Sequence, residues 1–179
     1  MLDSCSFFRF IGKPVSCERY GNGHINVTYL VRTDAGRDYI MQKINHRVFR
    51  DVPALMRNIH AVTSFLRTKE PEPRRVLTLV ETLDGQVYHR DAQGEYWRVY
   101  DFITDSLCLD KPEVLEDFYQ SAVAFGGFQN QLADFPADTL HETIPHFHDT
   151  PDRYLKLRAA IEQDSHGRAH EVQEEIAFA

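Results

Sequence analysis

The sequence is poor in cysteine and has no long apolar run. Its three cysteines, Cys5, Cys17 and Cys108, are an odd number, share no CxxC spacing and are too few for a disulfide scaffold. No stretch approaches the length of a membrane span, and the N-terminus carries Asp3 where a signal peptide has a base. These absences predict a soluble cytoplasmic protein with reduced thiols and no membrane partner.

Positive charge is also in deficit. The chain has 20 lysines and arginines against 27 acidic residues, a formal net charge of -7. Such a surface does not neutralise nucleic-acid phosphates, so we expect no nucleic-acid partner. With 179 residues, 42% of them hydrophobic, the chain can bury one good core or two small ones.

Alternating apolar residues predict an antiparallel sheet in the first part of the chain. The expected strands cover residues 15–20, 25–31, 39–44, 76–83, 86–89 and 95–103. The first three form a meander, and the fourth and fifth form a hairpin around Asp84 and Gly85. A single helix starts at Asp51 as N-cap, with Pro53 in its first turn, and runs to about Thr68.

The pattern changes after residue 103, where helical spacing replaces alternation. One long helix opens near residues 110–112, and a second opens with Thr150 as N-cap before Pro151. Strands followed by helices indicate an α+β fold with two lobes. The expected division is a lobe at 1–103 with five or six strands and one helix, a linker at 104–110, and the start of a helical lobe at 111–179.

A loop with two glycines joins the first two predicted strands. Rossmann and Walker loops lead from a strand into a helix, and neither pattern is present. A glycine loop between two strands is instead the device with which protein kinases cover ATP phosphates. Because Gly21 and Gly23 lack a Cβ atom, the backbone can approach a phosphate closely. The alternative is an ordinary hairpin turn, in which Gly and Asn are common.

Several sequence blocks taken together resemble the N-terminal half of N-acetylhexosamine 1-kinases, of the aminoglycoside phosphotransferase and choline kinase group. The blocks are YGNGHIN at 20–26, MQKIN at 41–45, LMRN at 55–58, WRVY at 97–100, AFGGFQN at 124–130 and TIPHFHDT at 143–150. The resemblance implies a protein-kinase-like fold. It also implies ATP and magnesium as cofactors, and an amino sugar that is phosphorylated at its anomeric hydroxyl.

Carried onto this chain, the resemblance implies a set of nucleotide-binding residues. The phosphate loop would contain Gly21, Asn22, Gly23, His24 and Asn26, the hinge beside adenine would be Tyr100, Asp101, Phe102 and Ile103, and Lys43 would be the phosphate lysine. Protein kinases pair that lysine with a glutamate on the next helix, yet no carboxylate occurs between Asp51 and Lys69. Asn58 is the nearest substitute, and a solvated strand lysine stays open as the alternative for Lys43.

Histidines provide the candidates for substrate binding. His24 could donate a hydrogen bond to a phosphate or to the sugar, and His146 and His148 could line the sugar cleft. A metal site is not predicted from His141, His146, His148 and Asp149, because no HExxH motif or Cys pair accompanies them. Structural roles are the alternative for these histidines.

The catalytic loop of this group, His-x-Asp-x-x-x-x-Asn, and its acidic magnesium-binding segment are absent from the sequence. We therefore expect a fragment or natural truncation that is inactive alone and that associates with a missing C-terminal half or with itself. The alternatives are a non-catalytic nucleotide-binding or oligomerising module and another kinase of the group, acting on an aminoglycoside or choline.

Overall fold

The computed structural model describes residues 2–106, 109 and 111–179. Two compact units divide the chain, Met1–Thr143 and Ile144–Ala179. The predicted linker at 104–110 includes residues 107, 108 and 110, which lie outside the described residues, so the predicted lobe boundaries stay a prediction. None of the described helices is long and apolar enough to cross a membrane.

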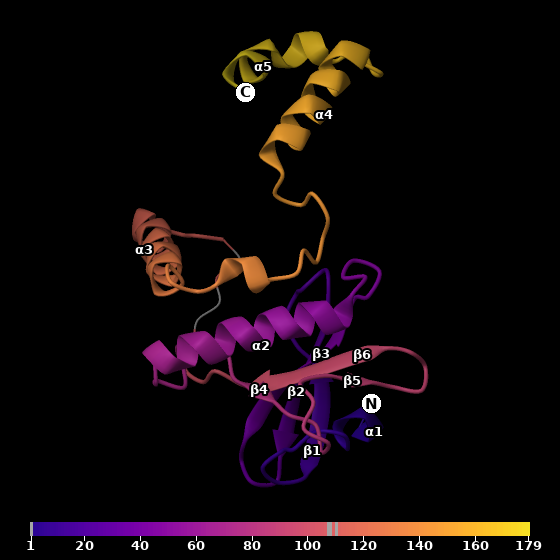
Figure 1. Cartoon of the computed structure of the whole chain (residues 1–179), viewed down its shortest axis with the longest axis vertical. Helices are drawn as coiled ribbons and strands as arrows, with labels where there is room; N and C mark the ends of the chain where they lie inside the picture. The colour runs from indigo at the N-terminus through magenta and orange to yellow at the C-terminus, as the bar shows by residue number, and fades with distance from the viewer. Residues whose placement is uncertain (1, 107–108, 110) are drawn as a thin grey trace. The chain divides into compact units, whose positions relative to one another are not determined.

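A six-stranded antiparallel sheet forms the centre of the first unit (Figure 1). The strands are β1 (Pro14–Arg19), β2 (Val27–Thr33), β3 (Asp38–Ile44), β4 (Leu79–Val80), β5 (His89–Arg90) and β6 (Tyr96–Asp101). Their order is β1-β2-β3-β6-β4, and β5 also pairs with β6. The predicted meander, β1 to β3, is confirmed. A short helix that the sequence did not predict, α1 (Leu2–Cys5), precedes the sheet.

The predicted hairpin of residues 76–83 and 86–89 is wrong. The turn itself exists, since the Thr82 N–H donates to the Gln86 carbonyl at 2.7 Å and Gly85 has a φ of 79°. The strands on either side of it do not pair with each other, however. Both β4 and β5 pair with β6. Val80 joins a buried cluster with Val99 of β6. Its backbone therefore pairs with β6 and not with residues 86–89, which are closer in the sequence.

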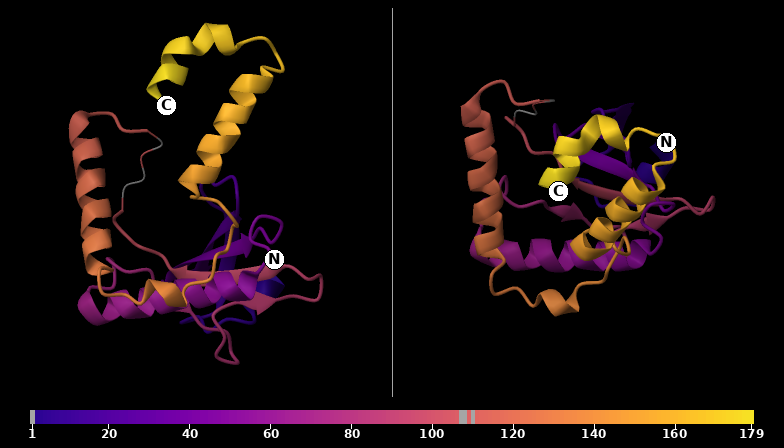
Figure 2. Two further views of the ribbon diagram at one scale, coloured as in Figure 1. Left: turned by 45° about the horizontal axis from the view of Figure 1, so that its top comes forward. Right: turned by 90° about the horizontal axis from the view of Figure 1, so that it is seen from above.

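Both faces of the sheet are covered by other parts of the unit. On the N-terminal face, the buried cluster consists of Cys5, Phe8, Val31, Tyr39, Met41, Val80, Trp97 and Val99. On the opposite face, which we call the helix face, Ile44 packs with Val52 and Met56 of α2 (Val52–Lys69). Figure 2 shows α2 beside the sheet in two further orientations. The central strands are therefore buried from both sides.

The α2 helix begins where the sequence predicts. The Asp51 carboxylate accepts a hydrogen bond from the Ala54 N–H at 2.8 Å, and Pro53 lies in the first turn. Val52, Ala54 and Met56 are buried along the face that meets the sheet. The cap therefore fixes the end of the helix that carries most of its core contacts.

Two predicted helix starts need correction. The first long helix, α3 (Leu115–Gln131), starts later than residues 110–112, because the Asp117 carboxylate accepts the N–H groups of Glu113 and Val114 at 2.8 and 3.1 Å. In the second unit, α4 (Thr150–Gln163) is capped by Asp149 and not by Thr150, since the Asp149 carboxylate accepts the Asp152 N–H at 3.0 Å.

The remaining helical segments are short. A 3-10 turn, η1 (Ala137–Thr139), follows α3 within the first unit. In the second unit, η2 (Ala169–Val172) and α5 (Gln173–Phe178) follow α4. The predicted fold class, an α+β lobe with an antiparallel sheet and one long helix followed by helices, is confirmed.

Candidate functional site

The glycine loop, residues 20–26, connects β1 and β2 as the sequence predicts. Gly21 has a φ of 71°, a left-handed conformation that favours glycine. A Cβ atom at Gly21 would meet no neighbour within 4 Å, and one at Gly23 would meet only the Asn26 carbonyl at 3.7 Å. Asn22 and His24 are exposed. The loop therefore presents open backbone to the solvent.

Contacts at both ends anchor this loop to the sheet and to the hinge. The Tyr20 N–H donates to the Thr28 carbonyl at 3.0 Å, and the Asn26 side-chain oxygen accepts the Asn45 N–H at 3.0 Å. The Tyr20 ring meets the Phe102 ring edge-on, with centroids 5.8 Å apart. One predicted loop residue, Asn26, thus has a structural bond. The predicted loop and the predicted hinge lie together.

The predicted hinge covers the end of β6, with Tyr100 and Asp101 in the strand and Phe102 and Ile103 after it. The Asp101 N–H donates to the Thr78 carbonyl at 3.0 Å and the Phe102 N–H to the Asp38 carbonyl at 3.2 Å. The Ile103 N–H makes no hydrogen bond to any residue that the structure describes. Asp101, Phe102 and Ile103 also line a hollow of about 260 Å³ with residues of the β2–β3 turn and of 73–78. Backbone at Ile103 is therefore available to a ligand.

The predicted phosphate lysine lies on β3, where its side chain shares the N-terminal face with Trp97. Lys43 is paired in register with Val27 and Trp97. Its Nζ lies 3.5 Å from one carboxylate oxygen of Glu95, and the other oxygen lies 3.7 Å from His46 Nδ1. Lys43 thus already has an anionic partner, and its role at a phosphate stays a prediction.

A polar row that the sequence reasoning missed crosses the helix face. Thr28, Gln42 and Arg98 are in register on β2, β3 and β6. The Gln42 amide donates to Thr28 Oγ1 at 2.9 Å, while Arg98 donates to the Gln42 oxygen through Nε at 3.0 Å and through one Nη at 2.8 Å. Burial lowers the pKa of the Arg98 guanidinium. The period of two along β3 was the available signal, since it groups Gln42 with Ile40 and Ile44.

Asn58, the suggested substitute for the kinase glutamate, binds backbone. Its amide donates to the His141 carbonyl at 2.7 Å, and its oxygen accepts the His141 N–H at 3.0 Å. Arg57 Nε also approaches His141 Nε2, at 3.3 Å. The Asn58 carboxamide therefore joins α2 to the segment after η1 and is not a partner of Lys43.

The candidate substrate histidines outside the loop belong to the second unit. His146 has a φ of 58°, and its Nδ1 lies 3.2 Å from Asp149 Oδ2. The hydrogen bond from the Asp152 N–H and the contact with His146 lower the pKa of Asp149. The His148 ring packs against Phe147, with centroids 4.5 Å apart. Within the described residues, no three His, Cys, Asp or Glu side chains gather as metal ligands.

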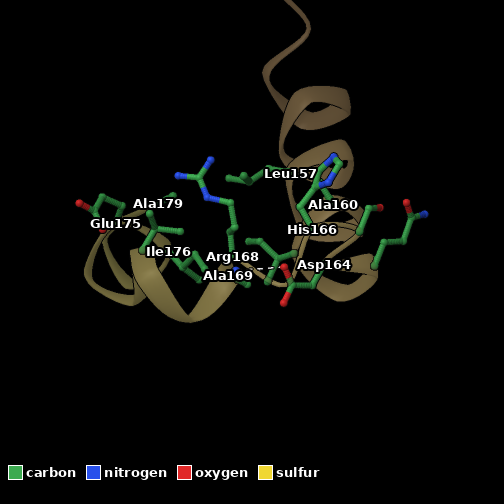
Figure 3. Close-up of a pocket in the computed structure, with 13 residues that line it drawn as sticks. Leu157, Ala160, Asp164, His166, Arg168, Ala169, Glu175, Ile176 and Ala179 are labelled. Carbon is green, nitrogen blue, oxygen red and sulfur yellow. Dashed lines mark hydrogen bonds between the residues drawn. The ribbon is translucent and has the colours of Figure 1, made fainter.

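The second unit also contains a groove of about 740 Å³ between α4, η2 and α5 (Figure 3). Leu157, Ala160 and Ile176 are among its lining residues, and the Asp164 carboxylate accepts the Ala169 N–H at 3.0 Å beside it. None of the predicted site residues lines it. Its lining combines these aliphatic residues with polar and charged ones, among them Gln163, Arg168 and Glu175.

Comparison with known families decides the wider assignment. The family model APH, the phosphotransferase enzyme family, matches residues 16–179. The chain belongs to the phosphotransferase enzyme family. This membership agrees with the wider group to which the sequence blocks point.

Solved structures similar to this phosphotransferase-family chain have the same fold. An aminoglycoside phosphotransferase from Alicyclobacillus acidocaldarius subsp. acidocaldarius DSM 446 has 14% identity and a TM-score of 0.64, over 99% of this chain and 50% of that one. An amicoumacin kinase in complex with AMP-PNP, Ca2+ and Ami has 12% identity and a TM-score of 0.59, over 99% and 53%. The chain thus spans about half the length of these structures.

Proposed function

We propose that this chain forms the nucleotide-binding lobe and the first acceptor-lobe helices of an ATP-dependent kinase of small molecules. The observation that carries the proposal is the open glycine loop between two strands, whose Tyr20 contacts Phe102 of the hinge. Membership of the phosphotransferase family supports it. The similar amicoumacin kinase was solved with AMP-PNP and Ca2+, which supports a nucleotide and a divalent cation.

Each part of the lobe has a role in holding the nucleotide. Backbone N–H groups of residues 21–24 bind the phosphates, because nothing in the loop blocks their approach. The Ile103 N–H binds the edge of the adenine ring, since it has no partner among the described residues. Magnesium, when bound, neutralises charge on the transferred phosphoryl group. Its expected ligands belong to the motifs absent from these 179 residues.

The proposed acceptor is the C1 hydroxyl of N-acetylglucosamine or N-acetylgalactosamine. The blocks around His24 and around His146 and His148 support this choice, because they resemble N-acetylhexosamine 1-kinases more than other members of the group. The oxygen of that hydroxyl attacks the γ-phosphorus of ATP, ADP leaves, and the hydroxyl proton passes to a base. That base belongs to the catalytic loop, so the 179 residues by themselves should not turn over.

The test is a kinase assay of the full-length protein with magnesium-ATP and a panel of N-acetylhexosamines, aminoglycosides and choline. Wild type should release a sugar 1-phosphate. Gly23→Val should lower kcat/KM for ATP on the order of 100-fold, because the side chain displaces the phosphates from the loop. The fold should tolerate this change, since Gly23 has no positive φ and no Cβ clash.

The matched control is Gly126→Val in α3, where a Cβ atom meets nothing within 4 Å and so, as at Gly23, causes no clash. It should keep the activity of wild type. If the protein phosphorylated only choline or an aminoglycoside, the proposed kinase activity would stand and the proposed acceptor would be wrong. Failure of the full-length protein to bind ATP would instead favour a non-catalytic, oligomerising module.

A further inference from the structure

The row of Thr28, Gln42 and Arg98 begins at the base of the glycine loop. The Thr28 carbonyl accepts the Tyr20 N–H, which is the last backbone bond before the loop opens. Because these three residues are directly opposite one another in an antiparallel sheet, their side chains lie on one face. That face is the one that also packs against α2, through Ile44.

The row is unusual because apolar residues occupy the rows on either side of it. Leu30, Ile40 and Tyr100 form one neighbouring row, and Ile44 and Tyr96 form the other. A cation placed between such rows is costly unless a group of opposite charge binds it.

Arg98 has no such partner within the chain as far as the structure describes it. Both of its hydrogen bonds go to one neutral oxygen, that of Gln42, and among the described residues no carboxylate forms an ion pair with it. The other guanidinium N–H groups make no hydrogen bond to a described residue. A guanidinium presents several N–H groups in a planar fork that matches phosphate oxygens.

Lys43 differs from Arg98 both in the face of the sheet on which it lies and in having an anionic partner. It lies on the opposite face of β3, and Glu95 already neutralises it. The β3 residue on the helix face is Gln42, which carries no charge. A kinase-type lobe holds its lysine with a glutamate from the helix, whereas here α2 has no carboxylate and the Gln42 oxygen orients Arg98.

We infer that Arg98, oriented by Gln42, is the cation that binds the nucleotide phosphates, in place of Lys43. The phosphate-binding cation then lies on β6, the strand next to β3, where protein kinases have their lysine. Because Gln42 orients it, this cation needs no acidic partner on α2. This inference rests on the proposed nucleotide site and adds the side chain that discriminates a phosphorylated nucleotide from its nucleoside.

The test compares the Kd of the full-length protein for magnesium-ATP with its Kd for adenosine, both by calorimetry. Arg98→Met should weaken ATP binding on the order of 10- to 100-fold and leave adenosine binding unchanged, because only a phosphate contact is lost. Lys43→Met, the rival assignment, should weaken ATP binding less. Arg90→Met, which removes an exposed arginine from the adjacent β5, is the matched control and should change neither constant.

A second variant covers the case in which Arg98→Met does not fold. Gln42→Glu keeps the shape and the acceptor oxygen but gives Arg98 an anionic partner, so it should lower ATP affinity about tenfold without loss of thermal stability. A role for Arg98 that is only structural would leave ATP affinity intact in this variant.

The outcomes separate the two proposals. If wild type binds neither ATP nor adenosine, the proposed function fails. If wild type prefers ATP, and Gln42→Glu or a folded Arg98→Met keeps that preference, the nucleotide site stands and the role of Arg98 is overturned. Loss of the preference in Lys43→Met alone would return the role to Lys43.

Discussion

At the scale of single residues, Asp91 sets the geometry between β5 and β6. Its carboxylate accepts the N–H groups of Gln93 and Glu95 at 3.0 and 2.9 Å and the buried indole N–H of Trp97 at 2.7 Å. Burial by itself would raise the pKa of Asp91, but these hydrogen bonds bring it below its usual value. The folded state therefore binds fewer protons, and the stability that Asp91 adds above its unfolded pKa is lost as the pH falls through the folded pKa.

We expect Asp91→Asn to lower the free energy of unfolding at pH 7 by about 1 kcal/mol, because a charged acceptor is lost. It should also flatten the decline in stability below about pH 4. Urea unfolding at several pH values measures both effects, with Asp138→Asn, at an exposed turn, as the control. An unchanged acid limb in Asp91→Asn would contradict this account.

At the scale of elements, α2 depends on its cap. Asp51 satisfies the Ala54 N–H at the end of the helix where Val52 and Met56 enter the core. Asp51→Ala should therefore reduce the free energy of unfolding by about 1 kcal/mol, whereas Asp51→Asn, which keeps an acceptor, should retain most of it. Equal losses in the two variants, measured by urea denaturation, would show that the charge and not the hydrogen bond stabilises this end.

At the scale of the whole molecule, the apolar surface of α3 is the main feature. Phe118 and Phe125 are 60% and 68% exposed, and no residue of α3 is buried. Exposed patches of this kind drive association. The 179-residue chain should therefore form concentration-dependent oligomers, and Phe118→Gln with Phe125→Gln should reduce them. A strictly monomeric wild type in light scattering would rule this out.

Local sequence signals predicted the local structure well. Alternation located β1, β2, β3 and β6 to within two residues at every end, and the Asp51 and Pro53 signal located the start of α2. The glycine loop was found between two strands because its flanks alternate on both sides. The starts of α3 and α4 were predicted less well than that of α2. The Asp117 side chain accepts the N–H of Val114, the residue before α3, and Asp149 caps α4 in place of Thr150.

The sequence by itself determined β1, β2, β3, β6 and the position of the glycine loop, because each depends on residues close together in the chain. The strands predicted at 76–83 and 86–89 were wrong in extent, since only Leu79–Val80 and His89–Arg90 are strand. The tertiary structure decided which strands pair with β6 and which face of β3 meets α2. Since β3 is buried on both faces, apolar residues occur at alternate and at intervening positions, and the pattern does not identify the helix face. Only the packing of α2 against Ile44 placed Gln42 and Arg98 on the helix face and left Lys43 on the other.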